Sequence, residues 1–332
     1  MSNIKPLLSI IISTHNNSKT IKRLIESFYK EIFSLIKKNE IEIVCIDDHS
    51  VDNSIKIISE YSEISIHKLH EHGISNSRNL GINIAKGKYL WFVDADDELV
   101  GSAIDTQFIN KLESYSADIF LLGAKKVNKG NTIECVNKIN GIYSLNKKFD
   151  GFNKIFKDNI LNCSWNKIYS TALIKKNNLK FQKIASGEDA LFNCDYLDKV
   201  NTIYIVNRIM YIYYINSTTS SKWSWDLKKT EASLEVAERV FSLKNNNLLI
   251  NDEIASRIII DSLIGIGINI FNKYENDLTL SVFKKEYSDS RLKHIKSCIK
   301  FNDLKKSYFL KGLIAKSPIL SYFYIKKAVL DK

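Results

Sequence analysis

Four acidic residues stand together directly after a short apolar run. The run is Tyr89–Val93, and the acids are Asp94, Asp96, Asp97 and Glu98. An apolar run of this length predicts a buried strand, whose C-terminal end is where open α/β sheets bind ligands. Like charges about 4 Å apart repel by roughly 4 kcal/mol at an effective dielectric of about 20, and a divalent cation relieves that cost. Oxygen-rich sites suit magnesium or manganese, so we expect a metal site here; the alternative is a solvated acidic turn.

The spacing of these acids predicts different roles for them. Asp94 and Asp96 are two positions apart. In an extended chain they would share a face, about 6.6 Å apart. One carboxylate could then bind a metal while the other holds a ribose hydroxyl. Asp97 would face away and is expected to have a capping or supporting role.

Two further polar segments follow predicted strands. The first is Ser13–Asn16, whose hydroxyls and imidazole could hold and stack a nucleobase. The second is Asp47–Asp52, where a carboxylate could accept a hydrogen bond from a base N–H or a ribose hydroxyl. Each segment has a structural alternative. The first could be a capped turn, and in the second Ser50 and Asp52 could cap the next helix.

The segment Gly73–Gly81 is rich in small polar residues. It matches neither a Walker loop nor the GxGxxG fingerprint. A helix that begins with such residues can face an anion, and Arg78 could reach a nucleotide from one turn further on. The alternatives are close packing of the helix on the sheet for Gly81, which we favour, and a surface ion pair for Arg78.

The elements that must position these residues alternate between strand and helix over the first hundred residues. The predicted strands cover 7–13, 42–46, 65–69 and 89–93. The predicted helices cover about 18–37, where Ser18 or Thr20 can cap, then 54–61 and 73–85. Such alternation predicts a mostly parallel sheet with helices on both faces.

The rest of the chain has a looser pattern and then becomes helical. Strands are expected over 119–122, 132–136 and 203–206, with a short helix over 190–197. Helices are expected over 227–243, 253–272, 304–313 and 319–330. The change of pattern near Trp225 marks a boundary. We expect a catalytic domain over 1–225, divided into a nucleotide-binding half (1–100) and an acceptor half (101–225), and a helical extension over 226–332.

The composition is that of a globular protein. The chain has 332 residues, 45% of them hydrophobic, and five scattered cysteines without a CxxC pair. Neither a disulfide framework nor a zinc site is predicted, and a reducing cytoplasm is expected.

The apolar stretches predict no membrane segment. Leu7–Ile12 is too short for a signal peptide. Asp261 and Asn269 interrupt the apolar stretch Ile258–Phe271, which is therefore expected to be a buried helix rather than a membrane span.

The positive charge is concentrated at the C-terminus. Of the net charge of +11, residues 291–332 carry eleven Lys or Arg against two acids, or +9. Aromatic residues lie among these lysines, a combination that suits an anionic membrane surface. The alternatives are a solvated helical cap and a nucleic-acid-binding module, although no recognisable nucleic-acid motif occurs.

Taken together, these segments resemble glycosyltransferase family 2, the inverting enzymes of the GT-A fold. The resemblance rests on SIIISTHNN, DDHSVD, NSRNLGINIAKGKY and DADD within about residues 7–99. It resumes at Trp165–Tyr169 and Gly187–Phe192. It implies an α/β fold of the GT-A type, with a nucleotide-binding, mostly parallel sheet flanked by helices and a C-terminal helical extension.

The resemblance implies a role for each residue at the donor side. Ser13, His15 and Asp48 would contact the uracil end of a UDP-sugar, with Arg78 nearby. His15 stands where the family more usually has tyrosine. A further family segment, Tyr211–Ser220, often carries a basic residue after its tyrosines that would contact the diphosphate.

Here Ile215 takes the place of that basic residue, and Arg208 or Lys222 could substitute for it. Asp94 would hold the ribose, and Asp96 would bind the divalent metal, Mn²⁺ or Mg²⁺, that bridges the diphosphate.

On the acceptor side, Asp189 would be the general base, with Glu188 and Trp165 beside the acceptor. The alternative for Glu188 and Asp189 is a helix N-terminus, which acids favour. The implied reaction is displacement with inversion at the anomeric carbon, and the acceptor is a glycan or polyprenyl-linked glycan of a bacterial surface polysaccharide such as lipopolysaccharide or capsule. The enzyme would be a hexosyl- or N-acetylhexosaminyltransferase, cytoplasmic or peripheral on the inner face of the membrane.

A metal-dependent nucleotidyltransferase is the alternative enzyme. It would need a phosphate-binding glycine loop after the first strand, and residues 13–17 contain no glycine.

Overall fold

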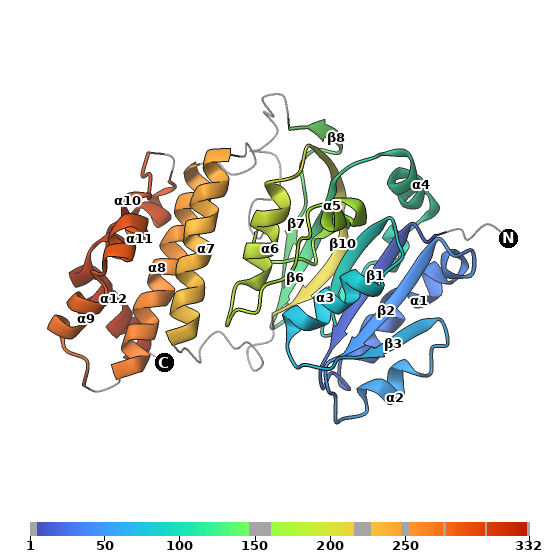
Figure 1. Ribbon diagram of the computed structural model, residues 1–332, viewed down its shortest axis with the longest axis horizontal. Coiled ribbons are helices and arrows are strands. Elements are labelled where there is room, and N and C mark those ends of the chain that lie inside the picture. The colour runs from blue at the N-terminus through green and yellow to red at the C-terminus, as the bar shows by residue number, and fades with distance from the viewer. Residues whose placement is uncertain are drawn as a thin grey trace. The chain divides into compact units, whose positions relative to one another are not determined.

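The chain forms two compact units in a computed structural model (Figure 1). The structure describes residues 5–145, 161–215, 227–246, 252–274, 277–302 and 304–330. The first unit comprises Met1–Lys183 and Lys199–Ser217, and the second comprises Ile184–Asp198 and Thr218–Lys332. We call them the sheet unit and the helical unit, because all described strands belong to the first. The predicted boundary at Trp225 falls outside the described residues.

The N-terminal half of the sheet is entirely parallel. Its strands are β1 (Leu8–Thr14), β2 (Ile41–Asp47), β3 (Ile64–Lys68) and β4 (Tyr89–Asp94), in the order β3-β2-β1-β4. All four strands are confirmed close to their predicted positions. Because they run in the same direction, their carboxyl ends meet at one edge, where Thr14 pairs with Asp47 and Ser13 with Asp94.

The other half of the sheet is mixed. It continues from β4 in the order β9-β6-β10-β5, with β7 beside β6 and β8 beside β10. The bounds of these strands are β5 Glu98–Leu99, β6 Ile119–Asn128, β7 Asn131–Cys135, β8 Gly141–Ser144, β9 Lys167–Ser170 and β10 Thr202–Tyr214. Only β6 and β10 run parallel to each other, and the other pairings within this half are antiparallel. The sequence patterns predicted β6, β7 and β10 but missed β5, β8 and β9, which have four residues or fewer.

Helices pack on both faces of the parallel half. They are α1 (Ile21–Lys37), α2 (Ser54–Ile58) and α3 (Ile74–Ile84). Ile10 and Ile12 of β1 share a core cluster with the apolar face of α1. Ile11 points to the other face, where a Cβ added at Gly81 of α3 would lie 2.5 Å from its Cγ2. The close-packing role predicted for Gly81 is therefore confirmed. The unit also contains the 3-10 helix η1 (Gly101–Ala103), α4 (Thr106–Ser114) and α5 (Thr171–Lys176).

The helical unit has its own apolar core. Its helices are α6 (Glu188–Leu197), α7 (Leu227–Asn246), α8 (Asp252–Tyr274), α9 (Leu280–Glu286), α10 (Ser290–Ser297), α11 (Lys306–Lys316) and α12 (Pro318–Leu330). Among the described residues, α8 alone is long and apolar enough to cross a membrane, but 61% of its most apolar window is buried. Ile259, Leu263 and Ile266 lie in the core of this unit, as expected for a buried helix.

Candidate functional site

The polar residues predicted from the sequence gather at the carboxyl edge of the parallel half. Ser13 and His15 follow β1, Asp48 follows β2, and Asp94 ends β4. The loop after β3 leads into α3, which begins at Ile74 and contributes Ser77 and Arg78. The Ser77 hydroxyl donates to Ser13 Oγ over 2.9 Å, so α3 and β1 are joined at this edge. The structure therefore brings together the predicted donor-side residues of the sheet unit.

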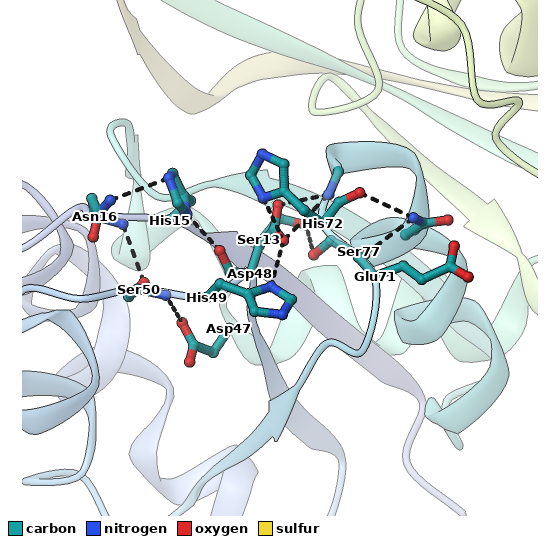
Figure 2. Close-up of polar contacts among 12 residues, drawn as sticks. Ser13, His15, Asn16, Asp47, Asp48, His49, Ser50, Glu71, His72 and Ser77 are labelled. Atoms are coloured by element: carbon teal, nitrogen blue, oxygen red, sulfur yellow. Dashed lines mark hydrogen bonds and ion pairs between the residues drawn. The ribbon is translucent and has the colours of Figure 1, made fainter.

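His15 is held in one orientation by its neighbours. Its Nδ1–H donates to the carbonyl oxygen of Asp48 over 2.5 Å, and the Asn16 amide donates to its Nε2 over 3.1 Å (Figure 2). The carbonyl can only accept, so the ring carries its proton on Nδ1, and the Nε2 lone pair points to the exposed Asn16 amide. The imidazole is therefore fixed in the loop between β1 and α1, with both ring nitrogens in hydrogen bonds.

The Asp48 carboxylate is the centre of a group of imidazoles that the sequence analysis missed. Gly73 N–H donates to its Oδ2 over 3.0 Å, and His72 Nδ1 donates to its Oδ1 over 3.0 Å. His49 Nδ1 lies 3.3 Å from the same Oδ1. The rings of His15 and His72 meet edge to face with centroids 5.1 Å apart. The sequence does contain a signal for this group of imidazoles: five of the six histidines lie between residues 15 and 72.

The acidic segment forms a tight turn rather than an extended chain. The N–H of Asp97 donates to the carbonyl oxygen of Asp94 over 3.2 Å. The expectation that Asp94 and Asp96 share one face of a strand is therefore wrong, because β4 ends at Asp94 and the chain reverses there. The turn is also tied to the start of α1. The hydroxyl of Thr20 donates to the carbonyl oxygen of Ala95 over 3.0 Å and makes no cap for α1.

A second contact from α1 to this turn comes from Arg23. Its Nη2 donates to the carbonyl oxygen of Asp96 over 2.6 Å, and its guanidinium lies 4.0 Å from the centroid of the Tyr214 ring. The sequence analysis did not single out Arg23, which looks like any other cation on a helix. The pairing of β1 with β4 explains its position, because that pairing brings the first turn of α1 to the end of β4.

Asp97 supports the turn from inside the protein. Its side chain is fully buried, and it accepts hydrogen bonds from the Tyr211 hydroxyl over 2.6 Å and the Tyr214 N–H over 2.9 Å. Burial, together with the negative charges of Asp94 and Asp96, raises the pKa of Asp97 to about 8, against the effect of these hydrogen bonds. The charge of the turn is therefore concentrated at Asp94 and Asp96, which are half-buried. This set of carboxylate oxygens fits a hard divalent cation such as Mg²⁺ or Mn²⁺.

Arg78 lies inside the protein and not on its surface. Its Nη2 is 3.2 Å from Asp94 Oδ1, with only 5% of the Arg78 side chain exposed. The guanidinium carbon also lies 5.2 Å from the centroid of the Phe181 ring. The surface ion pair considered for Arg78 is therefore replaced by a buried one, which orients the Asp94 carboxylate. A contact between Arg78 and a nucleotide remains a prediction.

Trp165 is buried in the mixed half of the sheet. It stacks on Tyr211 with ring centroids 4.6 Å apart and an interplanar angle of 12°, and on Tyr213 at 5.3 Å. The indole N–H of Trp91 donates to the carbonyl oxygen of Trp165 over 2.7 Å. These contacts connect Trp165 to the strand that carries the partner of Asp97. Its predicted place beside the acceptor remains a prediction.

Glu188 and Asp189 belong to the helical unit. They form the first turn of α6, after Gly187 at φ +84°. Arg239 holds this helix to α7 through Asp195, with Nε 2.7 Å from Oδ1. Acids in the first turn stabilise a helix through its dipole, so the helix-start alternative accounts for their presence there. The roles of Asp189 as general base and of Glu188 beside the acceptor remain predictions.

Arg208, one of the two candidates for the basic residue near the diphosphate, is paired with an acid in this structure. Its guanidinium makes two hydrogen bonds to Asp105, of 2.9 and 3.3 Å. Asp105 in turn caps α4 by accepting from the N–H of Phe108. Arg208 therefore has a structural role. Lys222, the other candidate, lies outside the described residues.

Comparison with protein families gives a match to one family model. Residues 9–177, about half of the chain, match the model described as "Glycosyl transferase family 2". The chain is 28% identical over 222 residues to poly(ribitol-phosphate) beta-N-acetylglucosaminyltransferase TarS of Staphylococcus aureus (strain Mu50), which covers 62% of this chain and 35% of TarS. It is 27% identical to the uncharacterized glycosyltransferase EpsJ of Bacillus subtilis (strain 168), over 64% of this chain and 62% of EpsJ. The chain thus spans about a third of the length of TarS.

Two solved structures have the same fold. The crystal structure of S. aureus TarS 1–349 in complex with UDP-GlcNAc matches with a TM-score of 0.65 and 19% identity, over 98% of this chain and 92% of that one. The mannosyltransferase PcManGT from Pyrobaculum calidifontis, in complex with GDP-Man and Mn²⁺, matches with a TM-score of 0.54 and 9% identity, over 97% and 88%. At these identities the likeness concerns the fold, which is the GT-A fold expected from the sequence.

Proposed function

Because the chain belongs to glycosyl transferase family 2, we propose that it moves a sugar with inversion from a UDP-sugar to a hydroxyl of a bacterial surface polysaccharide. The observation that carries this proposal is the meeting of Ser13, His15 and Asp48 with the Asp94–Asp97 turn at one edge of the sheet. The UDP-GlcNAc in the TarS structure supports a UDP-linked donor. The printed name of TarS supports a wall-polymer acceptor.

The residues at this sheet edge would bind the uracil and the ribose of the UDP-sugar. Ser13, His15 and Asp48 offer hydroxyl, imidazole and carboxylate groups to a uracil ring. Asp94, oriented by Arg78, offers its carboxylate to the ribose hydroxyls. The alternating hydrogen-bond donors and acceptors of uracil and ribose suit such groups, because a buried polar edge without a partner is costly.

Asp96 would hold a divalent cation at the acidic turn. When bound, such a cation supplies positive charge to the departing diphosphate as a Lewis acid. The residues of this chain fix the turn that carries Asp96 through Thr20, Arg23 and Asp97. A turn held by these contacts keeps its carboxylates in place, which is what a preorganised charge-stabilising site requires.

Asp189 would withdraw the proton of the acceptor hydroxyl. An acceptor hydroxyl is a weak nucleophile until a base about 2.6–3.2 Å away takes its proton, a contribution of roughly 10²–10⁴ in rate. The oxygen then attacks the anomeric carbon as the bond to the diphosphate breaks, and the configuration inverts. The first turn of α6 would present this carboxylate, with Glu188 next to it.

The proposal is tested with a panel of UDP-hexoses and UDP-N-acetylhexosamines in the presence of Mn²⁺. We expect UDP release with at least one donor. Asp189→Asn should abolish sugar transfer while UDP binding measured by calorimetry is unchanged. Asp277→Asn, an exposed acid of the same unit, is the matched control. Release of pyrophosphate from nucleoside triphosphates, without any sugar transfer, would favour a nucleotidyltransferase instead.

An exposed apolar row on α11 and α12 supports the predicted membrane partner. Its members are between 40% and 59% exposed: Phe309, Leu310, Leu313, Ile319, Leu320, Phe323 and Tyr324. Exposed lysines accompany them on the same helices, among them Lys306, Lys326 and Lys327. Apolar groups beside cations suit an anionic lipid surface, where each lysine contributes about 1 kcal/mol. A lipid-linked acceptor would be presented at such a surface.

Surface substitutions test this partner better than truncation. Removing the chain after Ser290 would take Leu292, Tyr322 and Ile325 out of the core. The double variant Leu320→Ser/Phe323→Ser should instead reduce flotation with anionic liposomes and leave the fold intact. A double variant of exposed residues elsewhere on the helical unit, Asp277→Ser/Lys284→Ser, is the control. Equal flotation of all three proteins would exclude the row as the anchor.

A further inference from the structure

A second group of metal-ligating side chains lies at the same sheet edge as the acidic turn. We propose that His15, Asp48 and His72 form a site for a divalent transition metal, of which Zn²⁺ is the best fit. One ring nitrogen of each histidine and one carboxylate oxygen of Asp48 lie within 4.8 Å of one another. Figure 2 shows the three side chains converging from separate loops.

The fold brings these ligands together from distant parts of the chain. His15 follows β1, Asp48 follows β2, and His72 lies in the loop between β3 and α3. Ligands bonded to one zinc ion at about 2.0–2.2 Å are themselves about 3.3 Å apart in a tetrahedron. His72 Nδ1 is already 3.0 Å from Asp48 Oδ1. The His72 side chain is 68% exposed, so small rotations can complete the approach.

The group already has the supporting hydrogen bonds that metal ligands need. A metal-bound histidine normally donates its other ring N–H to a carbonyl or carboxylate, which fixes its orientation. His15 does this through Nδ1–H and the Asp48 carbonyl, so Nε2 is the nitrogen that would bind the ion, in place of the hydrogen bond that it accepts from the exposed Asn16 amide. Gly73 N–H donates to Asp48 Oδ2 over 3.0 Å and also lies 3.3 Å from Oδ1, the oxygen that faces His72 and His49. On binding, the ion would replace the proton of His72 Nδ1, and His72 would keep a proton on Nε2.

The chemistry of the ligands selects the metal. Imidazole nitrogens favour Zn²⁺, Cu²⁺, Ni²⁺ and Co²⁺, whereas carboxylate oxygens alone suit Mg²⁺ and Mn²⁺. The two groups at this edge therefore differ in preference: the acidic turn offers only oxygen, and the Asp48 group offers two nitrogens and one oxygen. His49, with Nδ1 3.3 Å from Asp48 Oδ1, is placed to provide a fourth ligand.

A metal in this site would affect donor binding, a consequence that rests on the proposed function. His15 and Asp48 are the residues proposed to contact uracil. An ion that engages both would remove those contacts, so zinc would compete with UDP. Manganese, which prefers the acidic turn, would not. The same edge would then have one cation that assists donor binding and another that opposes it.

Zinc binding itself is tested without any nucleotide. Zn²⁺ is titrated into metal-free full-length protein by calorimetry, and Co²⁺ absorption reports tetrahedral coordination. We expect one bound ion in the wild type and an affinity at least about tenfold weaker in His72→Gln, because even the loss of a group that only supports a ligand costs about 10–100-fold. His67→Gln, a histidine of β3 outside the group, is the matched control and should bind as the wild type does. Thermal unfolding of all three proteins checks the fold.

Two results would overturn the site. One is the absence of a one-to-one zinc isotherm in the wild type, and the other is equal zinc affinity in the wild type and His72→Gln. A simple hydrogen-bonded group of imidazoles around Asp48 would give either result.

The competition is measured as the ratio of UDP affinities with and without Zn²⁺ within each protein, at constant Mn²⁺. This ratio should fall in the wild type and in His67→Gln, and should stay near one in His72→Gln. A ratio near one in the wild type, with zinc bound, would refute the competition. If UDP fails to bind under any condition, the proposed function is wrong, and the zinc isotherm alone decides the metal site.

Discussion

The two halves of the sheet contribute differently to the candidate site. The parallel half ends in loops that carry the polar groups, namely His15, Asp48 and Asp94. The mixed half contributes a wall of buried aromatic rings behind the acidic turn, with Trp165 stacked on Tyr211 and Tyr211 bonded to Asp97. The comparison separates groups placed to bind from groups that position them, and Tyr211, one of the second kind, lies 114 residues from Asp97 in sequence.

The aromatic wall of the mixed half explains how the acidic turn can hold several acidic side chains close together. Asp97 is fully buried close to two other acids, an arrangement that like-charge repulsion opposes. Tyr211 and Tyr214 of β10 supply the two hydrogen bonds that a buried carboxyl group requires. Substitutions in the mixed half should therefore reduce stability first, and substitutions in the parallel half should reduce donor binding first.

The largest expected effect is that of Trp165→Ala in the mixed half. The side chain is 4% exposed, and its removal leaves a cavity between Tyr211 and Tyr213. We expect a loss of about 3–5 kcal/mol in the free energy of unfolding, the usual cost of truncating a buried tryptophan. Denaturant unfolding measures it, and Trp165→Phe, which keeps a ring in the stack, should lose clearly less. Equal losses for the two variants would mean that stacking does not hold the wall.

The sequence predicted the parallel half well because each of its signals is local. The buried strand Tyr89–Val93 and the polar residues after it are contiguous, and parallel alternation then fixes which loops meet. The mixed half was not predictable in this way. Strand β9 has four residues, and its place between β4 and β6 depends on pairing across distant segments. The contact of Tyr211 with Asp97 depends on that same register.

The histidines around Asp48 show a different reason for a missed residue. His49 and His72 have no spacing typical of a metal site, because their ligand atoms meet only after three loops converge. Arg23 was missed for a similar reason, since only the pairing of β1 with β4 places it beside Asp96. Local patterns therefore predicted the strand ends, while tertiary contacts decided which side chains face one another.

The next largest effect is that of Asp96→Asn at the edge of the parallel half. Losing the carboxylate should lower turnover by about 10²–10³-fold, the range found when a charge-stabilising group is removed. The contact between Arg23 and the turn should survive, because it is made by the main-chain carbonyl of Asp96. UDP release gives the turnover, and calorimetry with and without Mn²⁺ gives the metal dependence of UDP binding.

The control for this variant is Glu113→Gln, an exposed acid on α4. If UDP affinity is indifferent both to Mn²⁺ and to Asp96→Asn, the acidic turn does not bind the metal. The division of roles between the two halves would then lose its main support.

A smaller effect, which involves both halves, is expected for Tyr211→Phe. The hydroxyl of Tyr211 donates to Asp97 and accepts the N–H of Asp94, so its loss leaves two buried polar groups with one partner fewer. We expect a loss of about 1–3 kcal/mol in stability. A weaker dependence of UDP binding on Mn²⁺ should accompany it, because the turn loses its support.

Tyr213→Phe is the matched control for Tyr211→Phe. The Tyr213 ring also stacks on Trp165, but its hydroxyl has no hydrogen bond to another described residue. This variant should lose less stability and keep the Mn²⁺ dependence. If Tyr211→Phe loses stability but keeps the Mn²⁺ dependence of UDP binding, the aromatic wall stabilises the fold without supporting the function of the turn.

The smallest effect is expected outside both halves, at Lys296 of the helical unit. Its ammonium donates to the carbonyl oxygen of Tyr287 over 2.5 Å, and burial, with the nearby Lys293, lowers its pKa to about 8. The unfolded chain, with an ordinary lysine pKa of about 10.4, binds more protons than the folded chain above pH 8, so stability should rise with pH there. Relative to Lys296→Met, the wild type should gain about 1 kcal/mol in the free energy of unfolding between pH 7 and pH 9.

Thermal unfolding at the two pH values measures this gain in stability, while the affinity for UDP should be the same in both proteins. A change in UDP affinity would show that the helical unit acts on the donor site, and the contrast between binding and positioning groups would then extend beyond the sheet.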